Sequence, residues 1–193
     1  MISNNHKDID YKVIVLLSGG IDSTACVQFY KNEGFDVQSI FIDYGQKSAN
    51  NEKKSARAVA RYYKTQINCI NSVSKLRDLS GVILGRNASL LFTAFMHLQL
   101  IKGILALGIH SGTDYPDSTT NFTIHIQSIF DLYTNGKVKI GAPFLKWSKG
   151  DIWEYLKTEN APINLTYSCE LGLEQPCGNC ISCSDLETLY AST

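Results

Sequence analysis

The sequence predicts an α/β fold: a doubly wound, mainly parallel sheet of five strands with helices on both faces. The first observation is a run of five apolar residues, 13–17, which is typical of a strand buried on both faces of a parallel sheet. The second is that short apolar runs then alternate with segments of helical periodicity, as in strand–helix–strand units. The chain has 193 residues, enough for one domain with a sizeable core.

The remaining elements follow in chain order. Further strands are expected at 36–42, 65–70, 104–109 and 138–140. Helices are expected from the residues after Gly20 through Tyr30, on a face formed by Ala56, Val59, Ala60 and Tyr63, and at 89–101, 122–133 and 148–159. Ser148 caps the last of these helices, with Asp151 three positions later. We expect a single domain over 1–193, with an α/β core at 13–165 and a metal-binding segment at 166–193.

Composition excludes several classes of function. Lys+Arg and Asp+Glu are equal at 18 each, so no net charge draws the protein to nucleic acid or to a membrane surface. No apolar run approaches the roughly 20 residues of a membrane span. Residues 1–12 are polar and lack the apolar centre of a signal peptide. We therefore expect a cytoplasmic protein with reduced cysteines, of which Cys26 and Cys69 are small buried side chains.

A glycine-rich turn follows the first strand directly. It reads Ser18-Gly19-Gly20-Ile21-Asp22-Ser23, and Asp22 or Ser23 is in position to cap the next helix. Adjacent glycines let a ligand approach the backbone, and the positive end of a helix attracts anions. The turn lacks the lysine of the nucleotide-hydrolase loop and the third glycine of the dinucleotide fingerprint. It predicts a phosphate site, with an ordinary glycine turn as the alternative.

Three other polar segments are placed to join that site. Residues 43–47 and 110–118 follow two strands, and ligands of doubly wound sheets bind beyond the carboxyl ends of the strands. Gly85-Arg86-Asn87 precedes a helix, where Arg86 and Asn87 are expected either to contact an anion or to serve as a surface arginine and a capping asparagine.

Four cysteines crowd near the C-terminus. They are Cys169, Cys177, Cys180 and Cys183, with Gly178 in the turn of the first Cys-x-x-Cys pair. Thiolates are preferred ligands of tetrahedral zinc, and a closed set of four favours a structural Zn²⁺ site. An iron–sulfur cluster takes the same ligands, and a redox dithiol is the third interpretation.

These motifs together resemble a known family. Ser-Gly-Gly-x-Asp-Ser resembles the pyrophosphate loop of the ATP pyrophosphatases (PP-loop proteins, with an adenine nucleotide α-hydrolase-like fold). The whole set resembles 7-cyano-7-deazaguanine synthase of queuosine biosynthesis: residues 17–24, Asp43-Tyr44-Gly45-Gln46, Gly85-Arg86-Asn87, the cysteine cluster and, more weakly, Tyr115-Pro116-Asp117. The resemblance implies conversion of 7-carboxy-7-deazaguanine, ammonia and ATP to the nitrile through two adenylations, with structural zinc and a homodimer.

The resemblance also implies roles for individual residues. Asp22 would hold Mg²⁺, Ser23 would belong to the catalytic phosphate loop, and Lys47 and Arg86 would offset charge on ATP or on the substrate carboxylate. ATP would contact Leu17, Ser18, Gly19, Gly20, Ile21, Asp22, Ser23, Thr24, Asp43, Tyr44, Gln46, Gly85, Arg86 and Asn87. The deazaguanine would contact Asp114, Tyr115 and Asp117, because carboxylates accept hydrogen bonds from a guanine-like edge.

The chain departs from the family pattern on the substrate side. The pattern Ser-Gly-Tyr-Pro-Asp-Cys-Arg has Ser118 here in place of Cys, Thr119 in place of Arg and Asp114 in place of Gly, and the segment before Gly85 is shorter. A second hypothesis is therefore a ligase that joins the adenylated carboxylate to a protein or other amine. Two further hypotheses are a sulfur transferase acting on RNA, which the neutral charge disfavours, and a zinc-stabilised nucleotide sensor.

Overall fold

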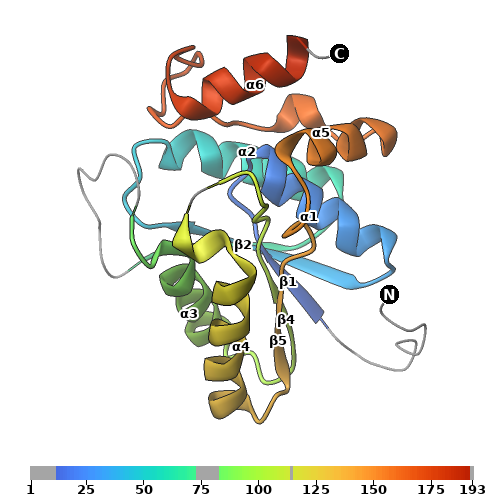
Figure 1. The fold of residues 1–193 in the computed structure, drawn as a ribbon, viewed down its shortest axis with the longest axis vertical. Coiled ribbons are helices and arrows are strands. Elements are labelled where there is room, and N and C mark those ends of the chain that lie inside the picture. Colours follow the sequence, from blue (N-terminus) through green and yellow to red (C-terminus); the bar gives the residue numbers. More distant parts are fainter. Residues whose placement is uncertain (1–11, 73–82, 114, 192–193) are drawn as a thin grey trace.

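The sheet has five parallel strands, as predicted (Figure 1). The computed structural model describes residues 12–72, 83–113 and 115–191. The strand order is β3-β2-β1-β4-β5, with β1 (Lys12–Leu16) between β2 (Asp36–Asp43) and β4 (Gly103–Ala106), and with β3 (Ile67–Asn71) and β5 (Val138–Gly141) at the edges. The chain builds the sheet outward from β1 on one side and then returns to pair β4 with its other side. The order therefore reverses between β1 and β4, where such folds bind ligands.

Helices cover both faces of the sheet (Figure 1). One face carries α1 (Ile21–Asn32), α2 (Ala49–Tyr62) and α5 (Lys149–Thr158). The other carries α3 (Arg86–Leu98) and α4 (Thr120–Thr134). Helix α6 (Ile181–Ala191) lies above α5 and α2, and short 3₁₀ turns occupy Pro116–Ser118 and Ile163–Leu165.

Alternation along β1 divides the interior into two cores. Val13, Val15 and Leu17 belong to the core under α1, α2 and α5. Ile14 and Leu16 belong to the core under α3 and α4. Successive side chains of a strand point to opposite faces, so an unbroken apolar run is what a strand buried on both faces requires.

Element boundaries differ from the predicted ones mainly at helix ends and around β4. Helix α3 begins at Arg86 and ends before Gln99, whose left-handed conformation (φ 47°) terminates it. Strand β4 stops at Ala106 instead of continuing to residue 109, and the Leu107 N–H makes the last hydrogen bond to β5, to the Gly141 carbonyl at 2.8 Å. The chain then leaves the sheet because Gly108 packs against the Asp22 backbone.

Two capping predictions were wrong and one is confirmed. Gly20, and neither Asp22 nor Ser23, is the N-cap of α1, and no side chain caps that end. Gly85 is the N-cap of α3, which leaves Asn87 inside the first turn. Ser148 and Asp151 form the expected capping box on α5.

Candidate functional site

The predicted phosphate loop, residues 18–23, called the phosphate loop below, lies between the end of β1 and the start of α1. Gly19 has φ +86°, and a Cβ on it would lie 2.6 Å from the Ala56 nitrogen. Its carbonyl accepts hydrogen bonds from the Ser55 hydroxyl (2.7 Å) and the Tyr167 N–H (2.9 Å), which hold it against α2 and the chain after α5. The first N–H groups of α1 have no acceptor within the helix, so they are available to an anion at this end.

Serine hydroxyls brace the same loop. Ser18 Oγ lies 3.0 Å from Ser23 Oγ and accepts a bond from the Gly20 N–H at 3.3 Å. The Ser23 hydroxyl also donates to the Gly20 carbonyl at 3.0 Å. Leu17 and Thr24 are buried beside the loop, and the Thr24 hydroxyl has no hydrogen-bond partner among the described residues. These contacts fix the shape of the turn before any ligand arrives.

Asp22 offers a buried carboxylate oxygen without a partner. Its Oδ1 makes no hydrogen bond within the described part of the chain. Its Oδ2 lies 3.8 Å from Nε2 of His110, a residue that is itself buried. The His110 Nδ1 accepts the Gly112 N–H at 3.0 Å, so the ring proton is on Nε2, facing Asp22. A carboxylate oxygen left unpaired beside a phosphate loop suits a divalent cation such as Mg²⁺.

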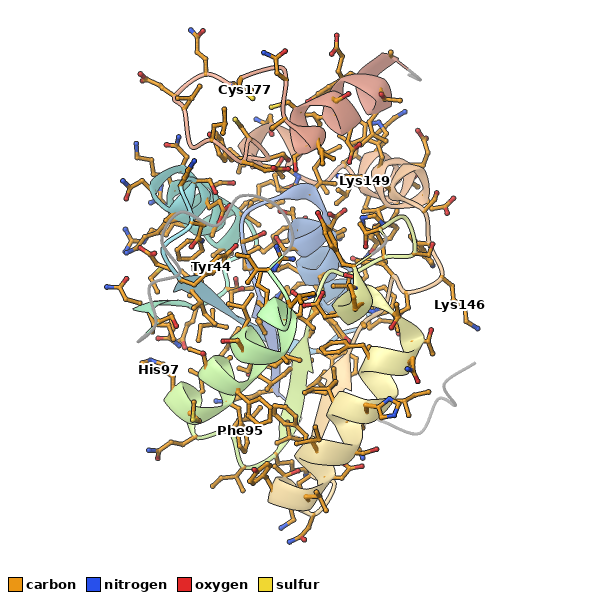
Figure 2. The ribbon with its side chains drawn as sticks, turned by 60° about the vertical axis from the view of Figure 1, so that its left-hand side comes forward. Tyr44, Phe95, His97, Lys146, Lys149 and Cys177 are labelled. Atoms are coloured by element: carbon orange, nitrogen blue, oxygen red, sulfur yellow. The ribbon has the colours of Figure 1, made fainter. Side chains whose placement is uncertain are left out.

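A lysine and a second aspartate complete the charge around Asp22. Lys149 is the first residue of α5, and its Nζ lies 2.9 Å from Oδ2 of Asp185 on α6. Figure 2 shows Lys149 in the layer between α6 and α1. Burial raises the pKa of Asp22, while the positive charge of Lys149 and then the neighbouring His110 ring oppose that rise, and the negative charge of Asp185 adds to it. Three groups on helices α1, α5 and α6, together with His110 in the loop after β4, therefore share one electrostatic site.

The Asp-Tyr-Gly-Gln block and the Gly-Arg-Asn block meet beyond β2. The hydroxyl of Tyr44, labelled in Figure 2, interacts with the Arg86 guanidinium, and burial raises the Tyr44 pKa while Arg86 opposes the rise. Gln46 accepts the Tyr44 N–H at 2.9 Å and donates to Glu52 at 2.9 Å. Asp43 accepts the Gly45 N–H at 2.9 Å, which closes the turn.

Asn87 joins α3 to the turn at Pro116–Ser118. Its N–H donates to Asp117 Oδ2 at 2.8 Å, and its side-chain amide donates to the Asp117 carbonyl at 3.0 Å. Asp117 thus satisfies a free N–H at the start of α3. Asn87 is buried inside the first turn of α3 and is not its cap. Arg86 is half-buried and is not a fully exposed surface residue.

The departures from the family pattern have structural roles of their own. Thr119 is the N-cap of α4, and its hydroxyl accepts the Phe122 N–H at 3.1 Å. Ser118 is buried, and Tyr115 is half-buried with its carbonyl accepting the Ser118 N–H at 2.9 Å. Asp114 lies outside the described residues, as does most of the short segment before Gly85. Lys47 is exposed at the rim, next to the buried Ser48.

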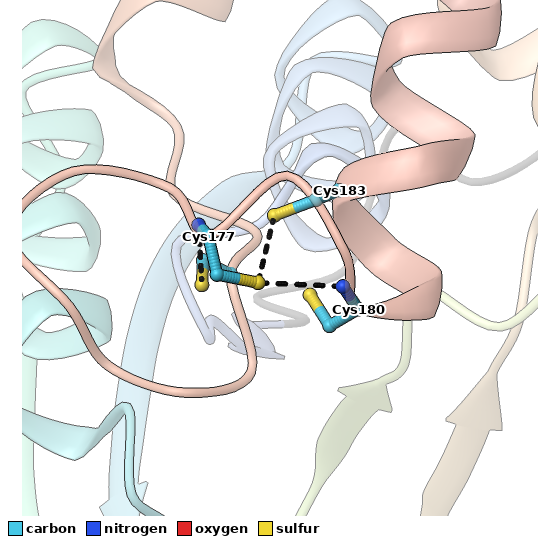
Figure 3. Close-up of side chains that lie close together, drawn as sticks. Cys177, Cys180 and Cys183 are labelled. Carbon is cyan, nitrogen blue, oxygen red and sulfur yellow. Dashed lines mark hydrogen bonds between the residues drawn. The ribbon is translucent and has the colours of Figure 1, made fainter.

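The four cysteines form one cluster. Their sulfur atoms all lie within 4.8 Å of one another, and Cys177 Sγ lies 3.9 Å from Cys183 Sγ. Figure 3 shows the thiols of Cys177, Cys180 and Cys183 turned toward one another at the start of α6. Zinc–sulfur bonds of about 2.3 Å in a tetrahedron put sulfurs about 3.8 Å apart, which matches this spacing. The residues present therefore fit a single bound metal ion.

Backbone amides prepare part of the cluster for a cation. Burial opposes ionisation of Cys169, but the N–H groups of Cys177 and Leu171 outweigh burial and lower the Cys169 pKa to about 6. The N–H groups of Asn179 and Cys180 lower the pKa of Cys177. Burial, with the neighbouring Cys180 thiol, raises the pKa of Cys183 to about 12. Metal ions bind the deprotonated form of cysteine, so the lowered pKa values of Cys169 and Cys177 favour metal binding here.

Sequence reasoning missed His110, Lys149 and Asp185 as members of the site. His110 was part of a polar loop with no role of its own, Lys149 stood beside a capping serine, and α6 was not predicted at all. The available signal was position: His110 follows β4, which neighbours β1 at the order reversal. Nothing in the sequence places Asp185 beside Lys149.

Solved structures with the same fold have distant sequences. NMN synthetase from Francisella tularensis matches with a TM-score of 0.56 at 14% identity, covering 89% of this chain and 72% of that one. U34-tRNA thiolase NcsA from Methanococcus maripaludis, solved with its [4Fe-4S] cluster, matches with a TM-score of 0.53 at 14% identity, covering 94% and 66%. At such identities the likeness concerns the fold alone.

Sequence relatives are closer. A 7-cyano-7-deazaguanine synthase of Desulfitobacterium hafniense is 32% identical over 90% of this chain and 85% of its own length. The enzyme of the same name from Acetivibrio thermocellus is 31% identical over 89% of each chain. The family model described as "Queuosine biosynthesis protein QueC" matches residues 12–90 and 80–192. This chain therefore belongs to the QueC family of queuosine biosynthesis proteins.

Proposed function

We propose that this chain uses ATP to activate the carboxyl group of 7-carboxy-7-deazaguanine and converts it with ammonia to 7-cyano-7-deazaguanine. The family supports a synthase of this class. The observation that carries the proposal is the phosphate loop at the order reversal, where the unpaired Asp22 carboxylate oxygen faces the same site as Lys149 and His110. These groups are suited to hold a polyphosphate and its cation.

The proposed reaction balances as two adenylations. The carboxylate oxygen attacks the α-phosphorus of ATP, which releases pyrophosphate, and ammonia then displaces AMP to give the amide. The amide oxygen attacks a second ATP, pyrophosphate leaves again, and loss of AMP with an N–H proton gives the nitrile. Both oxygens of the acid leave on AMP. The protein's contribution is positioning and charge stabilisation, since the leaving group is supplied by ATP.

The roles of individual residues follow from where they lie. The free N–H groups of Ile21, Asp22 and Ser23 would bind pyrophosphate, while Asp22 would hold Mg²⁺, which neutralises charge on the phosphate oxygens. Arg86, held beside Tyr44, would face the pyrophosphate or the substrate carboxylate. Lys47, at the exposed rim, would act from the side of the loop. The contacts of Asp114, Tyr115 and Asp117 with a deazaguanine remain proposals, as does a cytoplasmic location.

We propose zinc as the metal of the cysteine cluster. A [4Fe–4S] cluster puts a different iron behind each thiolate, so its sulfurs lie farther apart than four sulfurs that share one ion. Sulfur atoms that all lie within 4.8 Å of one another favour the single ion. A closed set of four thiolates leaves no open coordination position, so the metal would stabilise the C-terminal segment and take no part in the reaction.

A second product is favoured by the residues at the start of α4. The family pattern has an arginine at the position of Thr119 in this chain. The Thr119 hydroxyl caps α4 and supplies no positive charge. The substrate side has therefore changed while the ATP side has not. The alternative activity stops at an amide and joins the deazaguanine carboxylate to a protein or other amine, because a substituted amide lacks the second N–H proton that nitrile formation removes.

Mass spectrometry of the products formed from ATP, the deazaguanine acid and ammonia tests the proposal. We expect the nitrile with two AMP per product, and Asp22→Ala to abolish pyrophosphate release while circular dichroism stays unchanged. Persistent adenylation with little amide or nitrile would move the assignment to the amide ligase. ATP that is bound but unchanged would indicate a nucleotide sensor and would exclude both activities.

A homodimer is also a proposal, supported by an apolar surface on α3 and α4. These helices, of 13 and 15 residues, contain two formally charged side chains, Arg86 and Asp131. Their outward side exposes Met96, Ile124, Ile129, Leu132 and Tyr133. Exposed apolar patches of this kind mark protein interfaces, and a patch almost without charge can meet a second copy of itself without repulsion.

A further inference from the structure

The ion pair between Lys149 and Asp185 connects two parts of the molecule that the proposed chemistry treats separately. Lys149 begins α5, and its backbone lies beside Gly112, in the same turn as His110, whose Nε2 is 3.8 Å from Oδ2 of Asp22. Asp185 belongs to α6, whose first turn is built from the cysteine cluster. The Cys180 carbonyl accepts the N–H groups of Cys183 and Ser184 at 3.0 Å each, which places Asp185 one residue further along that turn.

Lys149 stands where helix electrostatics alone would not put a cation. The N-terminus of a helix carries partial positive charge, so a lysine at the first position of α5 is repelled by it. The side chain is nevertheless well packed, with 24% of its surface exposed against 43% for Asp185. A neighbouring carboxylate at 2.9 Å offsets that repulsion and gives the ammonium group a defined position.

The surroundings of Lys149 hold the start of α5 against the His110 turn. The Trp147 carbonyl accepts both the N–H (3.1 Å) and the hydroxyl (2.7 Å) of Ser111. A Cβ on Gly112 would lie 3.9 Å from the Lys149 nitrogen, so the two backbones nearly touch. The backbone of Lys149 is therefore fixed from one side by the turn after β4, and its ammonium group is fixed from the other side by α6.

We propose that Asp185 is a positioning residue that holds the Lys149 ammonium group at the phosphate loop, so that the cysteine-bearing segment contributes to ATP binding through the first turn of α6. The inference rests on the proposed use of ATP and extends it. Asp185 does not touch ATP. It limits the positions open to a long, flexible side chain, and the positive charge then faces the phosphates beside Asp22 with less entropy left to lose.

A double-mutant cycle in the metal-loaded protein tests this, with ATP affinity measured by calorimetry. Lys149→Met keeps the apolar stem and removes the charge, and we expect the dissociation constant for ATP to rise by about tenfold or more, as for a lost charge-assisted bond. Asp185→Asn should raise it by roughly three- to fivefold, in the range of a half-exposed ion pair. In the Lys149→Met background, Asp185→Asn should change it no further.

Controls separate positioning from folding. Glu187→Gln makes the same change of charge on the exposed side of α6 and should leave ATP affinity unchanged. Asp185→Glu should recover part of the affinity, and the metal content of Asp185→Asn should equal that of the unaltered protein. Additive effects of Asp185→Asn and Lys149→Met, or a loss of metal that accounts for the weaker binding, would overturn the inference. Failure of the unaltered protein to release pyrophosphate would overturn the proposed reaction, while the affinities would still decide the role of Asp185.

Discussion

Gly19 is the residue on which the geometry of the phosphate loop depends. Its positive φ disfavours any L side chain, and a Cβ would come within 2.6 Å of the Ala56 nitrogen and 2.8 Å of the Glu52 carbonyl oxygen. Gly20, the next residue, has φ −81° and no atom closer than 3.5 Å to its Cβ position. Two glycines that look equivalent in the sequence therefore have different tolerance for substitution.

Gly19→Ala should lower the free energy of unfolding by at least about 2 kcal/mol, from backbone strain and overpacking together. For a chain of this size that corresponds to a fall of roughly 4–8 °C in melting temperature. Differential scanning calorimetry measures it, with Gly20→Ala as the matched control, which should melt near the unaltered protein. Equal losses in the two variants would show that the close approach to α2 is not the cause.

Asp151 gives a residue-scale prediction about pH. Hydrogen bonds from the Ser148 backbone and then its hydroxyl hold the pKa of Asp151 below its ordinary value of 3.8. A lowered pKa in the folded state means stabilisation that is complete above the ordinary pKa and is lost as pH falls through the folded value. At pH 7 the unaltered protein should therefore have a higher melting temperature than Asp151→Asn. This difference in melting temperature should disappear as the pH falls below 3.8 toward the lowered pKa. A gap that persisted in strong acid would contradict the capping role, and Glu154→Gln in the same helix is the control.

At the scale of elements, contiguous features were predictable from the sequence and assembled ones were not. The first strand, the glycine turn and the cysteine cluster each occupy one short stretch of sequence. The structure has a buried strand at Lys12–Leu16, a glycine turn after it and four clustered thiols. Helix α6 escaped prediction because its buried residues, Cys183 and Leu189, give no clear apolar stripe. Its placement depends on a tertiary contact: the ring of Tyr190 on α6 lies 4.9 Å from the ring of Trp153 on α5.

The cysteine segment carries the element-scale prediction. Protein purified without oxygen should contain about one zinc per chain and no inorganic sulfide. Cys180→Ser should lose that metal and melt at lower temperature, because metal binding and local folding are coupled. Cys69→Ser, a half-buried cysteine on β3, should keep it. Stoichiometric iron with sulfide would refute zinc and favour the iron–sulfur interpretation.

For the whole molecule, the described residues contain no helix that is both long and apolar enough to cross a membrane. One group of exposed apolar residues, Met96, Ile124, Ile129, Leu132 and Tyr133, lies on α3 and α4, beside a hollow of about 370 Å³. Phe95, labelled in Figure 2, lines that hollow together with Gln99, Leu100, Ile101, Tyr133, Thr134, Asn135 and Lys137. Helices α3 and α4 therefore present a surface that is both apolar and poor in charge.

Leu132→Lys should shift the protein from dimer to monomer, because Leu132 is 82% exposed on that surface and a charge buried there without a partner is costly. Light scattering after gel filtration measures the mass. Tyr62→Lys, at an exposed position on α2, is the control and should leave the mass unchanged. If the unaltered protein is already a monomer at micromolar concentration, the proposed dimer is wrong.

The return of the chain to β1 has a kinetic consequence. The pairing of Val13 with Val37 closes a short loop, but the pairing of Val13 with Ile104 must wait for a much longer one. Long-range parallel pairing is slow, so β1, β2 and the turn between them are expected to form before β4 docks. Only after that docking do Gly108 and His110 reach Asp22. Recovery of ATP affinity during refolding should therefore follow the slowest phase of the reaction, and a newly made chain acquires its nucleotide site as one of the last events of folding.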